Sequence, residues 1–351
     1  MSQVLTVICP GETAPERFVQ TLEFALRDRR AQVRPRLEGA LEGRRVLFAV
    51  PLDESGVNHE FYSLLAHLRT HAGCLRGCVG GVLIDGAGDL HTKSIGRELV
   101  LAASLAGCAF PGRPLVEASG DLRNFTVQAR NAGCSLEEAC RRAAADLVRR
   151  VLDFAPPRHR RPNLLVLHAS SHPASNTLAL WSRCRERLEG ACDVTEIGLR
   201  NGTLADCAGC PYTACLHFGE RGDCFYGGVM VEEVYPAIRA ADGVVLLCPN
   251  YNDALPANLT AAVNRLTALY RAAPFENTAV FAIVVSGYSG GDIVASQVVS
   301  AMNMNKGFWL PPKFCMLETA NDAGTAVRLP GIEGRLEAFS GNILDQLLEK
   351  T

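Results

Sequence analysis

Continuous apolar runs of strand length recur along this sequence. Residues 243–249 read GVVLLCP and residues 280–286 read VFAIVVS, with amphipathic segments of helical length between such runs. A run that is apolar at every position is typical of a parallel strand that helices cover on both faces. Because these runs alternate with helices, the sequence predicts doubly wound parallel sheets of the α/β class.

The expected strands fall into two groups on either side of a proline-rich segment. In the first half they are 4–9, 33–37, 46–50 and 80–85; in the second half they are 164–169, 194–199, 243–249, 280–286 and 314–318. Residues 155–162 read APPRHRRP, and neither a helix nor a central strand can continue through them. We therefore expect one domain over 1–154, a linker over 155–162 and a second domain over 163–351.

The two halves share one order of elements. When VLFAVP at 46–51 is laid on VVLLCP at 244–249, Pro51 falls on Pro249. Further along, Gly86 falls on Gly287, and Glu117 falls on Glu318 with a one-residue slip. Matching strand, loop and helix lengths in the same order indicate an internal duplication.

Composition and charge exclude several classes of protein. Hydrophobic residues make up 48% of the 351 residues and the formal net charge is -2, which argues against a disordered chain and against a basic nucleic-acid-binding surface. The apolar runs are far shorter than the roughly 20 residues that span a membrane, and the N-terminus lacks the basic region of a signal peptide. We expect a cytoplasmic protein with no nucleic-acid or membrane partner.

Three polar loops follow expected strands of the second half: 169–178, 249–257 and 286–291. Ligands bind at the carboxyl ends of the strands in open α/β sheets, so the three loops predict one ligand site. Hydroxyl and amide groups at the helix start near Asn176 suit a phosphate. That loop has neither the Walker pattern nor Gly-x-Gly-x-x-Gly, and a plain helix N-cap stays an alternative.

The sequence holds 14 cysteines. In a reducing compartment most are expected to be small buried thiols, including Cys74, Cys78 and Cys108. Four others lie close together along the chain: Cys207, Cys210, Cys215 and Cys224. Four thiolates suit either a [4Fe–4S] cluster or a tetrahedral zinc ion. Loop cysteines without a metal are the third alternative, and His217 is a further possible ligand.

Over residues 163–320 the sequence resembles the NAD(P)H-dependent FMN reductase group, especially the iron–sulfur flavoproteins. The group's phosphate loop, Gly-Ser-Pro-Arg-x-x-Gly-Asn-Thr, is in register with ASSHPASNT at 169–177. Its Ser-Pro-x-Tyr segment and the Asp-Arg that ends the next helix correspond to CPNY at 248–251 and to Asn264-Arg265. The resemblance implies a flavodoxin-like fold for the second half. From the internal duplication, we expect the first half to be a second flavodoxin-like domain, a degenerate copy without a phosphate loop.

The resemblance also implies an FMN site. The residues expected to hold the FMN phosphate are Ser170, His172, Ser175, Asn176 and Thr177. Those expected around the isoalloxazine ring are Pro249, Asn250, Tyr251, Asn252, Asp253 and Ala254 on one side and Ser286, Gly287, Tyr288, Gly290 and Gly291 on the other. The family arginine is missing here, and His172 is expected to take its place. The second cysteine gap is longer than in iron–sulfur members of the family.

The expected function is that of an FMN-dependent oxidoreductase that passes electrons to a small acceptor, through a [4Fe–4S] cluster if one is bound. NAD(P)H and ferredoxin are both open as the reductant. The alternatives are a non-catalytic flavin electron carrier for a ferredoxin-like partner and a flavin reductase with a structural zinc site. The sequence identifies no catalytic acid or base, although four side chains could deliver a proton: His172, Tyr251, Asp253 and Tyr288.

The first half is expected to bind no flavin. Glu12 and Glu16 follow its first strand, where their carboxylates would repel a phosphate. We expect this half to act as a fused partner that covers the flavin site within one chain. A homo-oligomer of such chains stays open.

Overall fold

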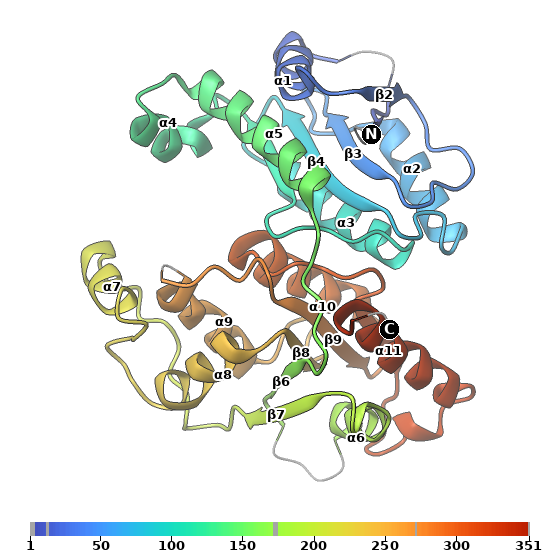
Figure 1. Cartoon of the computed structure of the whole chain (residues 1–351), viewed down its shortest axis with the longest axis vertical. Helices are drawn as coiled ribbons and strands as arrows, with labels where there is room; N and C mark the ends of the chain where they lie inside the picture. The colour runs from blue at the N-terminus through green and yellow to red at the C-terminus, as the bar shows by residue number, and fades with distance from the viewer. Residues whose placement is uncertain (1–3, 12–13, 171–174, 271, 350–351) are drawn as a thin grey trace. The chain divides into compact units, whose positions relative to one another are not determined.

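Each half of the chain builds one five-stranded sheet with helices on both faces (Figure 1). The computed structural model describes residues 4–11, 14–170, 175–270 and 272–349. The chain folds into two compact units, Met1–Ala155 and Pro156–Thr351.

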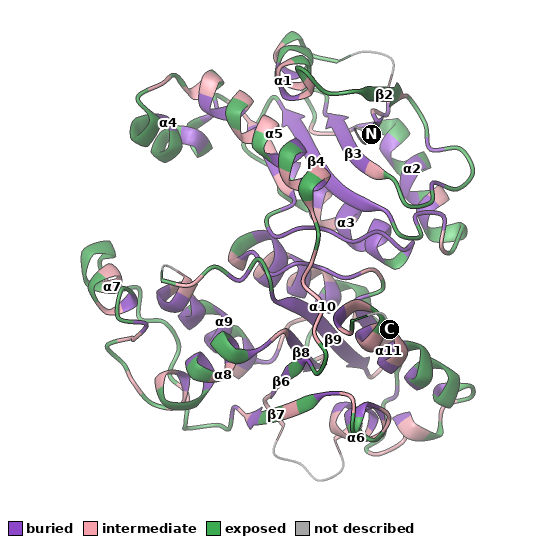
Figure 2. Cartoon of the chain, in the orientation of Figure 1, coloured by how far each residue is buried: buried purple, intermediate pink, exposed green. Residues whose placement is uncertain are grey.

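Most of the strands follow the apolar runs of the sequence. In the N-terminal unit they are β1 (Leu5–Ile8), β2 (Ala31–Arg34), β3 (Arg45–Pro51), β4 (Val79–Gly86) and β5 (Leu115–Ser119). In the C-terminal unit they are β6 (Asn163–His168), β7 (Asp193–Gly198), β8 (Gly243–Pro249), β9 (Ala279–Ser286) and β10 (Cys315–Thr319). The central strands β3, β4, β8 and β9 are buried along almost their whole length (Figure 2).

Both sheets have the flavodoxin-like strand order. The N-terminal sheet runs β2-β1-β3-β4-β5 and the C-terminal sheet runs β7-β6-β8-β9-β10, with every pair parallel. This order, 2-1-3-4-5, reverses direction beside the first strand, and that reversal creates a ligand-binding crevice at the carboxyl ends of the strands. The predicted fold class of two flavodoxin-like domains is therefore confirmed.

Helices cover the faces of each sheet. The helical elements of the N-terminal unit are α1 (Glu16–Leu26), α2 (His59–Thr70), α3 (Thr92–Leu105), η1 (Arg123–Phe125), α4 (Thr126–Ala132) and α5 (Leu136–Asp153). Those of the C-terminal unit are α6 (Asn176–Leu188), α7 (Tyr212–Gly219), η2 (Met230–Val234), α8 (Tyr235–Ala240), α9 (Ala257–Tyr270), α10 (Gly291–Val298), η3 (Val299–Lys306), η4 (Ala326–Arg328) and α11 (Ile332–Leu347). No helix among the described residues is long and apolar enough to cross a membrane.

The strand registers correct the residue matches between the two halves. Pro51 pairs with Asp85, and Pro249 pairs with Val285. Asp85 is therefore equivalent to Val285, and Gly86 is equivalent to Ser286 rather than to Gly287. By the same register Glu117, opposite Ile84, corresponds to Leu317, opposite Val284, rather than to Glu318. The sequence match was one residue out of register because it aligned like residues instead of strand partners.

An ion pair fills the carboxyl edge of the N-terminal sheet. The guanidinium of Arg17, at the start of α1, donates to both carboxylate oxygens of Asp85 at 2.7 and 2.9 Å. It also donates to the backbone carbonyls of Gly86 and Gly120. Arg17 is the second residue of α1, as Thr177 is of α6. At the edge where the C-terminal unit has a hydroxyl and an apolar side chain, the N-terminal unit thus has a cation and an anion.

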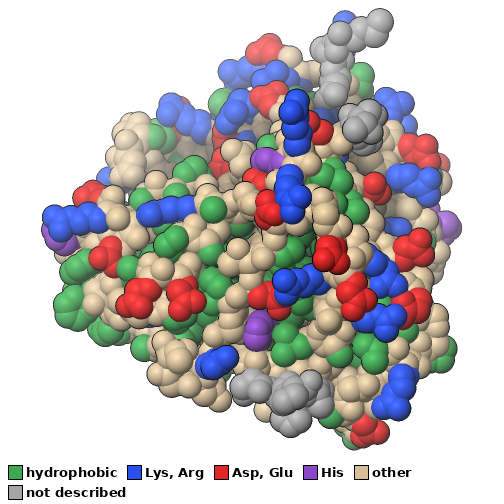
Figure 3. Space-filling view, turned by 60° about the horizontal axis from the view of Figure 1, so that its bottom comes forward, with side chains coloured by type: hydrophobic (Ala, Val, Ile, Leu, Met, Phe, Trp, Pro, Cys, Tyr) green, Lys and Arg blue, Asp and Glu red, His purple; other side chains and the backbone are tan. Residues whose placement is uncertain are grey.

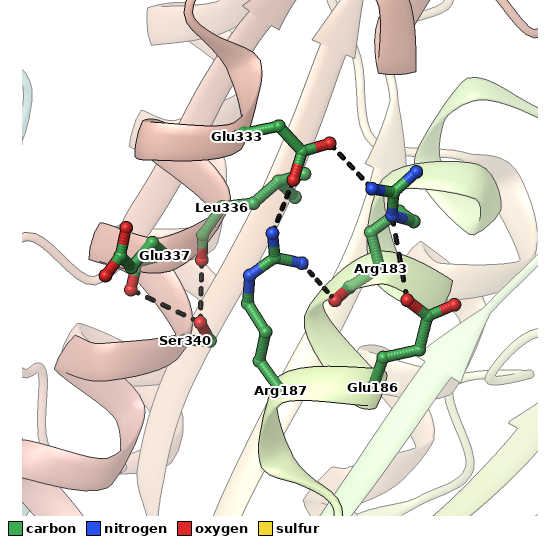
Figure 4. A network of polar contacts seen from close by, with 7 residues as sticks. All are labelled: Arg183, Glu186, Arg187, Glu333, Leu336, Glu337 and Ser340. Carbon is green, nitrogen blue, oxygen red and sulfur yellow. Dashed lines mark hydrogen bonds and ion pairs between the residues drawn. The ribbon is translucent and has the colours of Figure 1, made fainter.

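A second ion-pair network fixes α6 against α11 (Figure 4). Glu333 of α11 accepts from Arg183 of α6 at 2.8 Å and also from Arg187 one turn further on. Trp181 and Leu180 of α6 are buried beneath this polar surface. These ion pairs fix the C-terminal half of α6 against α11, while the N-terminal end of α6 lies where the predicted phosphate loop ends.

Candidate functional site

A cavity of about 650 Å³ lies at the carboxyl edge of the C-terminal sheet. Its volume falls within the range of about 300–1,000 Å³ that is typical of small-molecule sites. Four segments of the chain line it, at the start of α6 and after β8, β9 and β10. The lining residues are Ser170, Ser175, Asn176, Thr177, Pro249, Asn250, Tyr251, Asn252, Asp253, Val285, Gly287, Tyr288, Ser289, Ala320, Asn321 and Ala323.

The start of α6 presents hydroxyl groups beside its free backbone N–H groups. The Ser175 hydroxyl caps the helix by accepting from the Leu178 N–H at 3.4 Å, and it lies 3.0 Å from the Thr177 hydroxyl. Thr177 is buried at the cavity wall. Unpaired N–H groups and the helix dipole make such an end favourable for an anion.

Asn176 has a different role from its neighbours. Its amide nitrogen donates to the carbonyls of Ala320 and Asp322 at 3.1 and 2.9 Å. Its amide oxygen accepts from the Ala326 N–H at 3.1 Å. The side chain therefore ties the loop after β10 to the start of α6, and this loop forms one wall of the cavity.

The loop after β8 is a tight turn. Tyr251 and Ala254 form an antiparallel bridge, with the Ala254 N–H donating to the Tyr251 carbonyl at 3.2 Å. Between them, Asn252 and Asp253 both have a φ of 55°, a left-handed conformation that Asn and Asp tolerate better than other non-glycine residues. Gln297 of α10 holds the turn, since its side chain donates to the Asp253 carbonyl and accepts from the Leu255 N–H, both at 2.8 Å.

The loop after β9 interlocks with this turn. The Asn250 amide donates to the Ser286 hydroxyl at 3.1 Å and to the Ser289 carbonyl at 3.0 Å. Gly290 has a φ of 83°, and a Cβ there would lie 2.0 Å from an Asp253 carboxylate oxygen. Glycine at 290 is therefore required both by its backbone and by the approach of Asp253. Beside this frame, the rings of Tyr251 and Tyr288 are 64% and 82% exposed at the cavity.

The structure brings most of the predicted flavin-site residues to this one cavity. Ala254, Ser286, Gly290 and Gly291 do not line it, although the Ser286 hydroxyl accepts from Asn250 and Gly290 lies close to Asp253. His172 lies outside the described residues. Sequence reasoning missed the loop after β10, which contributes Ala320, Asn321 and Ala323. The polar Asn-Asp pair that follows the last expected strand was the available signal.

The electrostatics of the cavity come from few groups. Among the lining residues that the structure describes, Asp253 is the one carboxylate, and neither lysine nor arginine is present. The helix end at Ser175 and Thr177 is the feature of the described wall that would favour an anion. Over the face that Figure 3 shows, basic and acidic side chains are interspersed.

The four clustered cysteines lie in the segment between β7 and η2. Cys207 and Cys210 precede α7, Cys215 lies within it and Cys224 follows it. All four thiols are free, and Cys207 is exposed while the other three are half-buried. Within the described part of the chain, no three His, Cys, Asp or Glu side chains are grouped to hold a metal ion. The predicted metal site is not confirmed.

Most of the other cysteines are buried, as predicted, including Cys74, Cys78 and Cys108. Burial raises the pKa of the Cys192 thiol to about 11 and of the Cys184 thiol to about 12. These thiols stay protonated at neutral pH and behave as small apolar side chains.

Comparison with known proteins gives a family match within the C-terminal unit. Residues 162–322 match the family model described as NADPH-dependent FMN reductase. A comparison with curated proteins gave no match.

Solved structures of several reductases are similar to this chain. An NADH:FMN oxidoreductase in its apo form has 14% identity over 54% of this chain and 91% of its own, with a TM-score of 0.38. An NAD(P)H:quinone oxidoreductase from Methanothermobacter marburgensis has 14% identity over 53% of this chain and 96% of its own, with a TM-score of 0.37. An azoreductase from Bacillus anthracis has 15% identity over 53% and 99%, with a TM-score of 0.33.

The family match falls on the unit that carries the cavity, and it confirms the resemblance found in the sequence. Over residues 162–322, fewer than half of the 351 residues, the chain is similar to the NADPH-dependent FMN reductase family, a family of flavin-dependent oxidoreductases.

Proposed function

We propose that the cavity at the carboxyl edge of the C-terminal sheet binds FMN and that the protein reduces a small acceptor with electrons from NAD(P)H. One observation carries the proposal: a capped helix start and the two interlocked loops after β8 and β9 line one cavity of about 650 Å³. The same arrangement would suit a phosphate at one end and a flat ring at the other.

The residues fit FMN by the chemistry of their donors. Ser175 and Thr177 would hold the phosphate with their hydroxyls and with the first N–H groups of α6. Pro249, Tyr251 and Gly287 would line the ring, and Gly287 keeps that wall open because a Cβ there would lie 3.1 Å from the Asn321 side chain. When bound, FMN supplies hydride and single-electron chemistry, while the protein determines position and access.

The protein's own groups set access and proton supply. Tyr251, Asp253 and Tyr288 are the titratable side chains among the described lining residues. Tyr251 and Tyr288 are exposed, so their hydroxyls would hold a proton at the solvent side of the cavity. The Asp253 carboxylate accepts from the Asn250 amide at 3.2 Å and so braces the turn.

The test is the affinity for FMN of the purified chain and of Thr177→Val. This substitution keeps the shape of the buried side chain and removes its hydroxyl. The loss of one hydrogen bond to a charged group, about 1.5–3 kcal/mol, predicts roughly a tenfold to hundredfold rise in Kd, measured by quenching of flavin fluorescence. The matched control is Thr195→Val on β7, an exposed threonine outside the cavity, which should leave Kd unchanged.

A wild-type chain that binds no FMN overturns the proposal. If wild type binds FMN and Thr177→Val binds it equally well, the phosphate lies elsewhere. Steady oxidation of NAD(P)H in the presence of a quinone or free flavin would distinguish an enzyme from the alternative, a passive electron carrier for a ferredoxin-like partner.

Two finer assignments belong to the same proposal. We propose that the N-terminal unit binds no flavin, which is supported by the Arg17–Asp85 pair at the equivalent edge. We also propose that Cys207, Cys210, Cys215 and Cys224 take up one metal centre, either a [4Fe–4S] cluster or zinc, when their segment closes around it. Four free thiols in one segment are the donor set that both centres use.

A further inference from the structure

Asp253 is the one carboxylate among the described residues that line the cavity, and neither lysine nor arginine is among them. No ion pair joins Asp253 to a basic side chain in the described ranges. The residue is exposed at the cavity wall. Its charge therefore acts on a molecule that enters the cavity rather than on a partner within the chain.

The loops around this cavity have an excess of acidic residues. Residues 250–256, 287–292 and 320–325 follow β8, β9 and β10, and each of these stretches holds one aspartate and no lysine, arginine or histidine. The start of α6, which also borders the cavity, has free N–H groups that favour an anion. The cavity thus has one wall that favours an anion and loops that favour a cation. The three aspartates are Asp253, Asp292 and Asp322.

The backbone of the turn does not require an acid at position 253. Asn252 and Asp253 have the same φ of 55°, so the turn already accommodates an asparagine in this left-handed conformation. The Asn250 amide donates to Oδ1 of Asp253 at 3.2 Å, and an amide oxygen could accept that hydrogen bond as well. The turn therefore does not explain the negative charge at 253, and Asp253→Asn should leave the turn folded.

Neighbouring residues fix the position of the carboxylate. Gln297 of α10 donates to the Asp253 carbonyl at 2.8 Å, and Gly290 approaches so closely that a Cβ there would lie 2.0 Å from Oδ1 of Asp253. Tyr251 and Tyr288, which also line the cavity, are 64% and 82% exposed. Aromatic faces attract cations and stack on flat rings. A fixed carboxylate and two exposed phenol rings in one cavity therefore suit a flat organic cation.

We propose that Asp253 makes the cavity select flat acceptors that carry a positive charge; the inference rests on the FMN site proposed above. Such an acceptor would enter beside FMN, with its ring near Tyr251 or Tyr288 and its charge near the Asp253 carboxylate. The same carboxylate would repel an acceptor that carries a sulfonate or a carboxylate group. Asp253 is thus a residue that determines specificity through binding, and no bond forms or breaks in the selection.

The experiment titrates the FMN-loaded full chain with three probes of one shape: the cation 1-methylquinolinium, neutral quinoline and the anion quinoline-3-carboxylate. Flavin absorbance reports binding, so no turnover is needed. One charge interaction in contact with water changes the affinity about fivefold. Wild type should therefore bind the cation about fivefold more tightly than quinoline and about 25-fold more tightly than the carboxylate.

Three variants identify the source of the preference. Asp253→Asn removes the charge and should bring the three Kd values to within about threefold of one another. Asn252→Asp adds a carboxylate to the same turn and should increase the preference for the cation. Asp345→Asn on α11 is the matched control, an exposed aspartate outside the cavity, and should match wild type. Raising the salt concentration from about 0.05 M to about 0.5 M should reduce the wild-type preference and leave that of Asp253→Asn almost unchanged.

The outcomes separate this inference from the proposed FMN site. A wild-type chain that binds no FMN overturns both. If FMN binds but the cation binds no more tightly than the carboxylate, only the selection is overturned. An equal preference in wild type and Asp253→Asn overturns the role of Asp253 alone. If Asp253→Asn binds FMN poorly, the salt dependence of wild type and the effect of Asn252→Asp decide, and a preference that neither of them changes overturns the inference.

Discussion

The Arg17–Asp85 pair offers a sharp test of how the N-terminal unit closes its carboxyl edge. The Asp85 side chain is 3% exposed and that of Arg17 is 30% exposed. The hydrogen bonds to Asp85 raise the pKa of the Arg17 guanidinium. Arg17→Met keeps much of the side-chain length and leaves the buried carboxylate without its cation.

The expected cost is large for a single substitution. Breaking a buried ion pair by removing one partner costs about 3–5 kcal/mol. Because Arg17 is partly exposed, water can reach the freed carboxylate, and we expect the lower end, about 3 kcal/mol. Asp85→Val in the Arg17→Met background removes the stranded charge and installs the residue that the C-terminal unit has at this position, Val285. The double variant should regain most of the loss, within about 1.5 kcal/mol of wild type.

Urea denaturation gives the free energies of unfolding, and hydrogen exchange of β4 and β5 amides reports the same loss locally. A cycle of wild type, Arg17→Met, Asp85→Val and the double variant isolates the pair. The reasoning is refuted if Arg17→Met costs less than about 1 kcal/mol, below the range for a broken buried pair. It is equally refuted if the double variant is as unstable as Arg17→Met.

Two further predictions concern the C-terminal unit. Gly290→Ala should destabilise it by about 1–3 kcal/mol and weaken FMN binding, because the new Cβ would meet Asp253 at 2.0 Å and the φ of 83° suits glycine; urea denaturation and flavin titration check this, and unchanged values would contradict it. Burial lowers the pKa of the His168 imidazole below its ordinary 6.5, so folding favours the neutral ring. Its contribution to stability is complete above pH 6.5 and is lost as pH falls from there through the lowered folded pKa. The urea midpoint of wild type should therefore fall between pH 7 and pH 5 more than that of His168→Gln, and equal slopes would exclude the effect.

The buried strands could be predicted from sequence, whereas the sheet edges could not. β8 and β9 coincide with their apolar runs because both faces of each strand are covered. β2 spans Ala31–Arg34 rather than 33–37, since it is an exposed edge strand that ends before Pro35. β5 was missed altogether: its side chains alternate between buried and half-buried, so LVEAS shows no continuous apolar run.

The candidate site was predictable as a place but not as a set of contacts. The strand ends located three of its four walls, because parallel strands bring their carboxyl ends to one edge. Sequence could not show that Asn176 is engaged with Ala320 and Asp322, nor that Ser286 lies behind the wall. Such roles depend on which neighbour lies within hydrogen-bond distance, and that neighbour comes from a distant part of the chain.

The carboxyl edges of the two units share one backbone arrangement but differ at two side-chain positions. One edge has a cavity, and the other is filled by an ion pair. The second residue of the first helix is Thr177 in the C-terminal unit and Arg17 in the N-terminal unit. The equivalent positions on the fourth strand of these units are Val285 and Asp85. A short hydroxyl beside an apolar side chain leaves a cavity with an anion-binding helix end above it. In the N-terminal unit, the guanidinium of Arg17 and the buried carboxylate of Asp85 occupy that space and neutralise each other. Neither residue of the Arg17–Asp85 pair reveals this alone, because each by itself would be an ordinary charged residue at the end of a helix or a strand. Our proposal that the N-terminal unit binds no flavin therefore rests on the pair, which is why the double variant, and not either single one, is the decisive comparison.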